Sequence, residues 1–66
     1  MEKELLQRIA SEIRAERARA GLTQQDLANQ AGLHVNAIAA YEAGKKDMRL
    51  SSLEKISKSI NYIFTI

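Results

Sequence analysis

Apolar residues recur along this chain at intervals of three and four positions, which is the spacing of one face of an α-helix. In the first part of the chain Leu6, Ile9, Ala10 and Ile13 share such a face, and charged residues stand mostly between them. The pattern predicts an amphipathic helix from about Glu2 to Ala20. The glycine that follows, Gly21, is a natural end for it.

A second, shorter helix is predicted directly after this glycine. Thr23 and Asp26 have the spacing of a capping box, in which the threonine side chain and the third helical residue satisfy each other's backbone N–H groups. The helix is expected to run to about Gln30. Gly32 stops it, because glycine adopts the positive φ that a tight turn requires.

A third helix is predicted over about residues 35–43, with His34 at its N-cap and Gly44 after its last turn. Ala28 is small at the point where this helix must approach the one before it. Over residues 24–43, small and apolar residues occupy the positions at which two short helices that cross at a steep angle contact each other. The residues expected to point inward are Leu27, Ala31, Leu33, Ile38 and Tyr41.

After a polar loop at residues 45–49, the periodicity predicts a fourth helix that ends near Asn61, a residue type that tolerates the left-handed conformation. One face of this helix is expected to carry Leu50, Leu53, Ile56 and Ile60.

The last five residues are rich in aromatic and β-branched side chains, which predicts a short strand. They are Tyr62, Ile63, Phe64, Thr65 and Ile66. Because no other segment resembles a strand, the simplest pairing partner is the same tail of a second molecule, antiparallel about a two-fold axis. The alternative is a tail that folds back as an extended apolar plug.

Length and composition restrict the kind of protein further. With 66 residues, the chain is expected to form one small domain over residues 1–66, with marginal stability of its own. It has no cysteine and one histidine, so neither a disulfide framework nor a thiolate or histidine-cluster metal site is expected, and no cofactor is predicted. No apolar run is long enough to span a bilayer, and the charged start does not resemble a secretory signal. These features predict a cytoplasmic protein that does not bind membranes.

Charge and side-chain chemistry favour a binding protein and not an enzyme. Ten Lys and Arg against eight Asp and Glu give a net charge of +2, which permits nucleic-acid binding without proving it. The carboxylates of the first helix alternate with arginines, as on a solvated face, and offer no buried pair for acid–base catalysis. No catalytic triad and no glycine-rich phosphate loop is evident.

A set of linked positions extends over most of the chain, from Ile9 to about Ile60. They are Arg17, Gly21, Leu22, Thr23, Gln24, Leu27, Ala28, Gly32, Leu33, Ile38, Tyr41, Glu42 and Gly44. In this combination the sequence resembles the phage Cro and repressor-type helix-turn-helix family of transcriptional regulators. The resemblance implies an all-α, compact four-helix DNA-binding domain, with the helix-turn-helix at about residues 24–43. The dimerisation tail at residues 62–66 is predicted from its strand character alone.

The resemblance implies that the exposed side of the third helix reads base edges in the major groove, through Val35, Asn36, Ala39 and Ala40. Asn36 is the strongest candidate, because its amide can pair with N6 and N7 of adenine, and Val35 can contact a thymine methyl group. Ala39 and Ala40 replace the longer polar side chains common in the family. Base readout is therefore expected to be weak or largely apolar.

Contacts to the DNA backbone or minor groove are implied for a second set: Thr23, Gln24, His34, Lys45, Lys46 and Arg49. Gln24 opens a helix whose free N–H groups can bind a phosphate, although a solvated surface residue is the alternative. His34 either donates to a phosphate or only caps its helix. The lysines complement the helix dipole and can also bind a phosphate. Arg49 either enters the minor groove or remains in solvent.

Two further residues have structural roles by the same resemblance. Arg17 and Glu42 are expected to form an ion pair that ties the first helix to the recognition helix. Tyr41 shares the inward face of Ile38 and is interpreted as a core residue, not as a platform for base stacking.

The leading functional hypothesis is a sequence-specific regulator of transcription that binds double-stranded DNA, a repressor acting as a homodimer on a palindromic operator. The second is an antitoxin that represses its own operon and binds a toxin protein, since the helix-then-strand ending resembles that of some antitoxins. The third is a helical protein-interaction module that has lost DNA binding.

Overall fold

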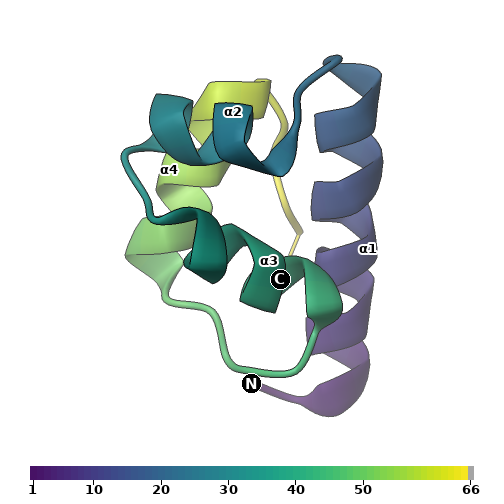
Figure 1. Ribbon diagram of the computed structural model, residues 1–66. Coiled ribbons are helices and arrows are strands. Elements are labelled where there is room, and N and C mark those ends of the chain that lie inside the picture. The colour runs from purple at the N-terminus through teal and green to yellow at the C-terminus, as the bar shows by residue number, and fades with distance from the viewer. Residues whose placement is uncertain (66) are drawn as a thin grey trace.

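The computed structural model describes residues 1–65, and Ile66 lies outside the described residues. Over that range the chain forms four helices and no strand: α1 (Lys3–Arg19), α2 (Gln24–Ala31), α3 (Val35–Ala43) and α4 (Leu50–Ile60). In Figure 1, α1 and α4 lie on opposite sides of the molecule, and α2 and α3 span the space between them. The predicted all-helical domain is confirmed, with each helix boundary within a residue or two of its predicted position.

The capping box predicted at the start of α2 is present. The Thr23 side chain accepts a hydrogen bond from the Asp26 N–H, and the Asp26 carboxylate accepts one from the Thr23 N–H, each at 3.0 Å. Hydrogen bonding from the Thr23 backbone N–H, followed by that from the Thr23 side chain, lowers the pKa of the Asp26 carboxyl below its ordinary value. Thr23 and Asp26, which are close together in the sequence, thus fix the start of α2.

The predicted helix ends also occur where the backbone turns left-handed. Gly32 has φ of +70° after α2, and Gly44 has φ of +65° after α3. Asn61 ends α4 with φ of +51°, and it is the one non-glycine residue with positive φ in the described part of the chain. Asparagine tolerates this conformation better than most residues because of its short polar side chain.

All four helices contribute to one hydrophobic core. Its largest fully buried side chains are Ile9, Ile13, Leu27, Ile38 and Ile56. Ala28 of α2 is also completely buried, which allows α2 to pack closely against its neighbours. Burying each of these branched side chains contributes about 2 kcal/mol, so the core holds together helices that are individually too short to be stable in water.

One prediction for α4 is wrong: Leu50 was placed on its inward face, but its side chain is 69% exposed. The buried face of α4 is set by Ser52, Leu53 and Ile56. A position one helical turn of 3.6 residues before Ser52 and Leu53 lies near residue 49. The inward-facing position at the N-terminal end of α4 is therefore occupied by Met48, which is 5% exposed. Met48 belongs to residues 45–49, for which the sequence predicts a polar loop.

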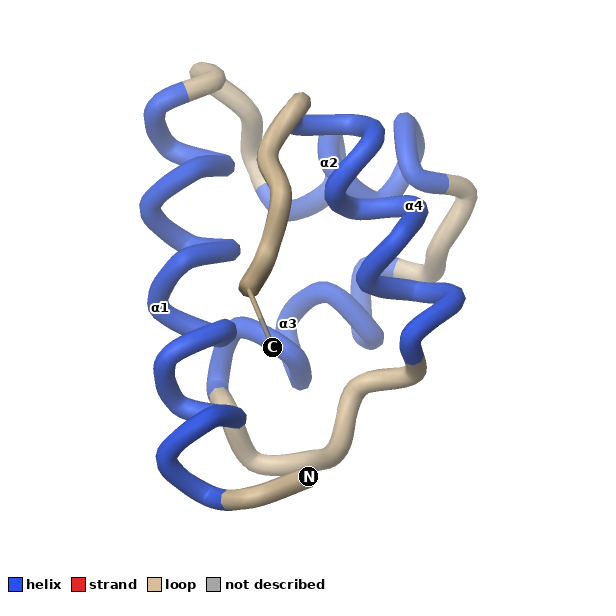
Figure 2. The backbone as a smooth tube through the Cα atoms, turned by 180° about the vertical axis from the view of Figure 1, so that it is seen from behind, coloured by secondary structure: helices blue, strands red, loops and turns tan. Residues whose placement is uncertain are grey.

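The predicted C-terminal strand is also wrong for the described residues of the tail. Tyr62 to Thr65 run back along the molecule as an extended segment between α1 and α4 (Figure 2). The Tyr62 N–H donates to the Ser57 carbonyl at 3.1 Å, and the Ser57 hydroxyl donates to the Tyr62 carbonyl. These contacts come from the same chain, as in the alternative in which the tail folds back.

Side chains of α1 complete the attachment of the tail. The Tyr62 hydroxyl donates to the Glu12 carboxylate at 2.5 Å, and Arg8 donates to the Thr65 carbonyl at 2.5 Å. Phe64 packs against the core, with its ring edge-on to that of Tyr62 and the ring centroids 5.1 Å apart. The tail is thus held by hydrogen bonds of Tyr62 and Thr65 and by its half-buried aromatic rings, all within one chain, which weakens the argument for a strand across a dimer. Ile66, also predicted to belong to this strand, lies outside the described residues.

Candidate nucleic-acid interface

α2 and α3 form a helix-turn-helix unit joined by the turn at residues 32–34. The Leu33 N–H donates to the Ala28 carbonyl at 2.9 Å, and this bond closes the turn after α2. Six residues of the two helices are buried: Leu27, Ala28, Ala31, Ile38, Tyr41 and Glu42. The Tyr41 hydroxyl donates to the Ser52 side chain at 3.3 Å within the protein, so Tyr41 is a core residue.

The opposite side of α3 faces solvent. Asn36, Ala39 and Ala43 are exposed and lie on one helix face by their spacing. Ala40 is half-buried, and Val35 is half-buried and packs against the core. Of the four residues predicted to contact bases, Asn36 and Ala39 are therefore the most accessible. Val35 presents only part of its side chain.

His34 stands at the N-terminus of this helix as its cap. Its Nδ1 accepts a hydrogen bond from the Asn36 N–H at 3.1 Å, and the ring is exposed. A neutral imidazole that accepts at Nδ1 carries its proton on Nε2. His34 can therefore cap α3 and donate to a phosphate at the same time, so the two roles weighed for it are compatible.

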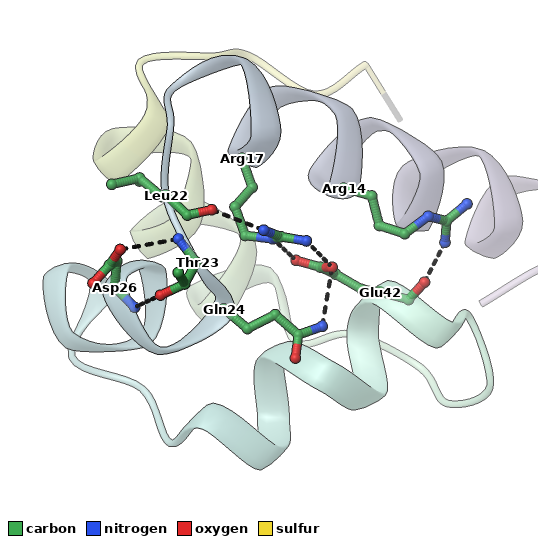
Figure 3. A network of polar contacts seen from close by, with 7 residues as sticks. All are labelled: Arg14, Arg17, Leu22, Thr23, Gln24, Asp26 and Glu42. Atoms are coloured by element: carbon green, nitrogen blue, oxygen red, sulfur yellow. Dashed lines mark hydrogen bonds and ion pairs between the residues drawn. The ribbon is translucent and has the colours of Figure 1, made fainter.

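Gln24 and Thr23 occupy the start of α2, where the first N–H groups of the helix have no partner within the helix. The Gln24 side-chain amide donates to Glu42 Oε1 at 3.1 Å, which places the start of α2 beside the end of α3 (Figure 3). A second amide hydrogen of Gln24 is not used in this bond, so the side chain can also donate to a phosphate. Thr23 is exposed beside it.

Glu42 is the centre of a polar network between three helices, shown in Figure 3. Its carboxylate is 3% exposed and accepts from Arg17 Nε at 2.6 Å and from Arg17 Nη2 at 3.0 Å. Arg17 Nη1 donates to the Leu22 carbonyl at 2.8 Å. The hydrogen bonds to Glu42 raise the pKa of Arg17 above its ordinary value. The ion pair locks α1 onto α3.

Other polar residues of α1 hold the end of α3, and the sequence analysis missed them. Arg14 donates to the Glu42 carbonyl, and Gln7 donates to the Gly44 carbonyl at 2.8 Å. Their spacing of seven places them on one stripe of α1, which is the sequence signal that could have identified them. Both satisfy carbonyls that the end of a helix leaves without a partner.

The exposed cations of the interface follow α3. Lys45, Lys46 and Arg49 are exposed in the loop that leads to α4. The Arg49 carbonyl accepts from the Leu53 N–H at 3.0 Å, so its backbone opens α4 while its side chain makes no capping bond. Together with Gln24, the lysines lie at the end of α3 opposite to His34. Side chains that are able to donate to a phosphate thus flank α3 at both ends.

In residues 1–65, no set of three or more His, Cys, Asp or Glu side chains is gathered so that it could hold a metal ion. None of the helices over the same range combines the length and apolar character needed to cross a membrane.

Comparisons with known proteins agree with this architecture. A helix-turn-helix family model matches residues 13–62. A search of curated proteins found no match. Among solved structures, a tyrosine-to-phenylalanine mutant of the restriction–modification controller protein C.Esp1396I is similar, with 32% identity, a TM-score of 0.87, and coverage of 96% of this chain and 80% of that one. The chain therefore belongs to the Cro/C1-type helix-turn-helix family of DNA-binding transcriptional regulators.

Proposed function

We propose that this protein is a sequence-specific repressor that binds double-stranded DNA as a homodimer on a palindromic operator. The observation that carries the proposal is the outward face of α3, which presents Asn36 between phosphate donors at both helix ends. An α-helix with its side chains is about 10–12 Å in diameter, which fits the major-groove width of about 12 Å, so α3 can lie in the groove. His34 then lies at one end of the helix, and Gln24, Lys45 and Lys46 lie at the other.

A dimer is supported by an apolar surface at the junction of α4 and the tail. Leu50 and Ile63 are 69% and 85% exposed, and they border a shallow groove that also includes Leu53 and Phe64. Two-fold pairing of such a surface buries both exposed side chains at once. In this proposal, pairing through the apolar surface replaces the predicted pairing of C-terminal strands. Two copies of α3 about 34 Å apart would bind half-sites one helical turn apart.

Repression follows physically from occupancy, because a dimer covering a promoter excludes other proteins from the same DNA. The similarity to a restriction–modification controller protein supports a regulatory role. The antitoxin hypothesis depended on a strand after α4, and the described tail residues form none. We therefore retain the repressor alone.

The test is selection of bound DNA from a random library at about 150 mM salt, where nonspecific phosphate binding is partly screened. Recovery of a palindrome with half-sites one turn apart is expected, and transcription from a promoter carrying it should fall when the protein is added. A protein that enriches no sequence would overturn the proposal in favour of a protein-interaction module.

The dimer is tested separately by sedimentation of the Leu50→Glu variant. Because Leu50 is already exposed, the substitution should leave the fold intact while charging the surface proposed to pair. The variant should be monomeric and bind the palindrome weakly. Ala15→Glu, at an exposed site on α1, adds the same charge and should remain dimeric. If Leu50→Glu also remains dimeric, the two copies meet elsewhere.

A further inference from the structure

The chemistry of the outward face of α3 is unusually simple. Within α3, all of which is described, Asn36 is the one exposed polar side chain, and Ala39 and Ala43 share its face at helical spacing. The only charged residue of the helix, Glu42, is buried and held by Arg17. This face therefore contains no arginine or lysine for guanine and no free carboxylate for the amino group of cytosine.

The groups that this face can recognise follow from the chemistry of base edges. An asparagine amide pairs with N6 and N7 of adenine, and an alanine methyl group makes apolar contact with the C5-methyl group of thymine. Alanine side chains are short, so the helix backbone can approach the floor of the groove closely. A methyl group at C5 of cytosine occupies the same place in the major groove as that of thymine.

We infer that Ala39 and Ala43 read the C5-methyl groups of pyrimidines, with Asn36 fixing an adenine beside them. The inference rests on the proposed DNA-binding function and specifies the bases of its half-site. Thymine supplies the methyl group in ordinary DNA, and 5-methylcytosine supplies it in methylated DNA. Binding then responds to cytosine methylation at those positions, with methylation strengthening the complex.

The experiment uses the operator selected above, with each thymine of one half-site replaced in turn by uracil. This replacement removes a methyl group and leaves every hydrogen-bonding group of the base unchanged. At thymines that face Ala39 or Ala43, affinity should fall about fourfold, the factor that corresponds to about 0.8 kcal/mol per buried methyl group. At the same positions, a cytosine–guanine pair should bind weakly, and 5-methylcytosine should recover about fourfold over cytosine.

A matched pair of variants connects this effect to α3. Ala39→Gln removes the apolar contact at an exposed helical site, and glutamine is nearly as good a helix former as alanine. At the thymine that faces Ala39, the variant should bind the thymine and uracil forms of the operator equally well, while thymines that face Ala43 keep their preference. Ala15→Gln, the same change at an exposed site on α1, should retain the full preference for thymine.

The outcomes separate the two proposals. If the protein selects a DNA sequence but binds its uracil and thymine forms equally at every position, the methyl readout is wrong and the DNA-binding function stands. If no thymine loses its preference in Ala39→Gln, Ala39 reads no methyl group and the assignment to that residue fails. If no sequence is selected at all, the proposed function fails and the inference fails with it.

Discussion

Arg17 of α1 and Glu42 of α3, separated by 25 positions in the chain, are joined by hydrogen bonds of 2.6 and 3.0 Å from one guanidinium to one carboxylate. The carboxylate is almost completely buried, and Gln24 of α2 donates to it as well. Three helices thus converge on one charge. The orientation of α3 relative to α1 and α2 depends on that charge remaining paired.

Arg17→Ala should therefore lower the free energy of unfolding by about 3 kcal/mol, because it leaves a buried carboxylate without its cation. Urea denaturation followed by circular dichroism measures the loss. Arg19→Ala removes an exposed arginine that pairs with Glu16 in the last turn of α1 and should cost less than about 0.5 kcal/mol. Similar losses in the two variants would mean that the Glu42 pair contributes no more than an exposed one.

Asn36→Ala should relax the preference at one base pair of the half-site, at a cost of about 1 to 3 kcal/mol in specific binding. The fold should be unaffected, since the side chain is exposed and alanine is a better helix former. Binding to the selected operator and to its single-base variants measures the change. Unaltered discrimination at every base pair would exclude Asn36 from readout.

Lys46→Gln should weaken binding to all DNA sequences by a similar factor. If Lys46 contacts one phosphate, removing its charge reduces the slope of log affinity against log salt by about 0.9 per chain. Titrations at several salt concentrations provide that slope. Lys58→Gln, at an exposed site near the end of α4, should leave the slope of the parent protein unchanged. A Lys46→Gln slope equal to that of the parent would place Lys46 away from the DNA backbone.

The tail should detach from α1 at alkaline pH. The hydrogen bond from the Tyr62 hydroxyl to Glu12 raises the pKa of Tyr62, and burial and the Glu12 charge act in the same direction. A group whose pKa is raised by folding contributes its stability fully below its ordinary pKa of about 10 and loses it as the pH rises through the raised value.

The difference in stability between the parent protein and Tyr62→Phe should consequently be constant near neutral pH and shrink above pH about 10. Denaturation at a series of pH values provides this comparison. Glu12→Gln should bring the pKa of Tyr62 back toward its ordinary value, as read from the ultraviolet absorbance of the phenolate. A parent protein that behaves like Tyr62→Phe at every pH would show that the bond to Glu12 contributes nothing to stability.

Gly44→Ala should cost more stability than Gly21→Ala. Both glycines have positive φ, which costs a residue with a Cβ atom about 1 kcal/mol. A Cβ atom at Gly44 would stand 2.8 Å from the side-chain nitrogen of Gln7, whereas one at Gly21 would point into open space.

The additional cost at Gly44 is about 1 kcal/mol, the value of the Gln7 hydrogen bond that must be displaced. In a Gln7→Ala background the two glycine substitutions should cost the same, because the side chain in conflict is absent. Thermal denaturation of the two series provides the comparison. A difference that persists in that background would place the conflict elsewhere.

Much of the fold could be predicted from the sequence, because helices and their ends depend on residues close together in the chain. The spacing of Ile9 and Ile13, the Thr23–Asp26 capping box and the glycines at 32 and 44 each act over a few residues, and all have their predicted roles in the structure. The crossing of α2 and α3 was predictable for a similar reason, since the turn between them is three residues long.

The tertiary structure decided the features that depend on contacts between distant residues. Strand propensity in the tail was overruled because Glu12 and Arg8 of α1 bind the Tyr62 hydroxyl and the Thr65 carbonyl and Phe64 packs against the core. Met48 replaced Leu50 in the core because the register of α4 is set by its packing on the other helices. Local sequence therefore determined where each helix begins and ends, and long-range burial and hydrogen bonding determined which surface remained for DNA.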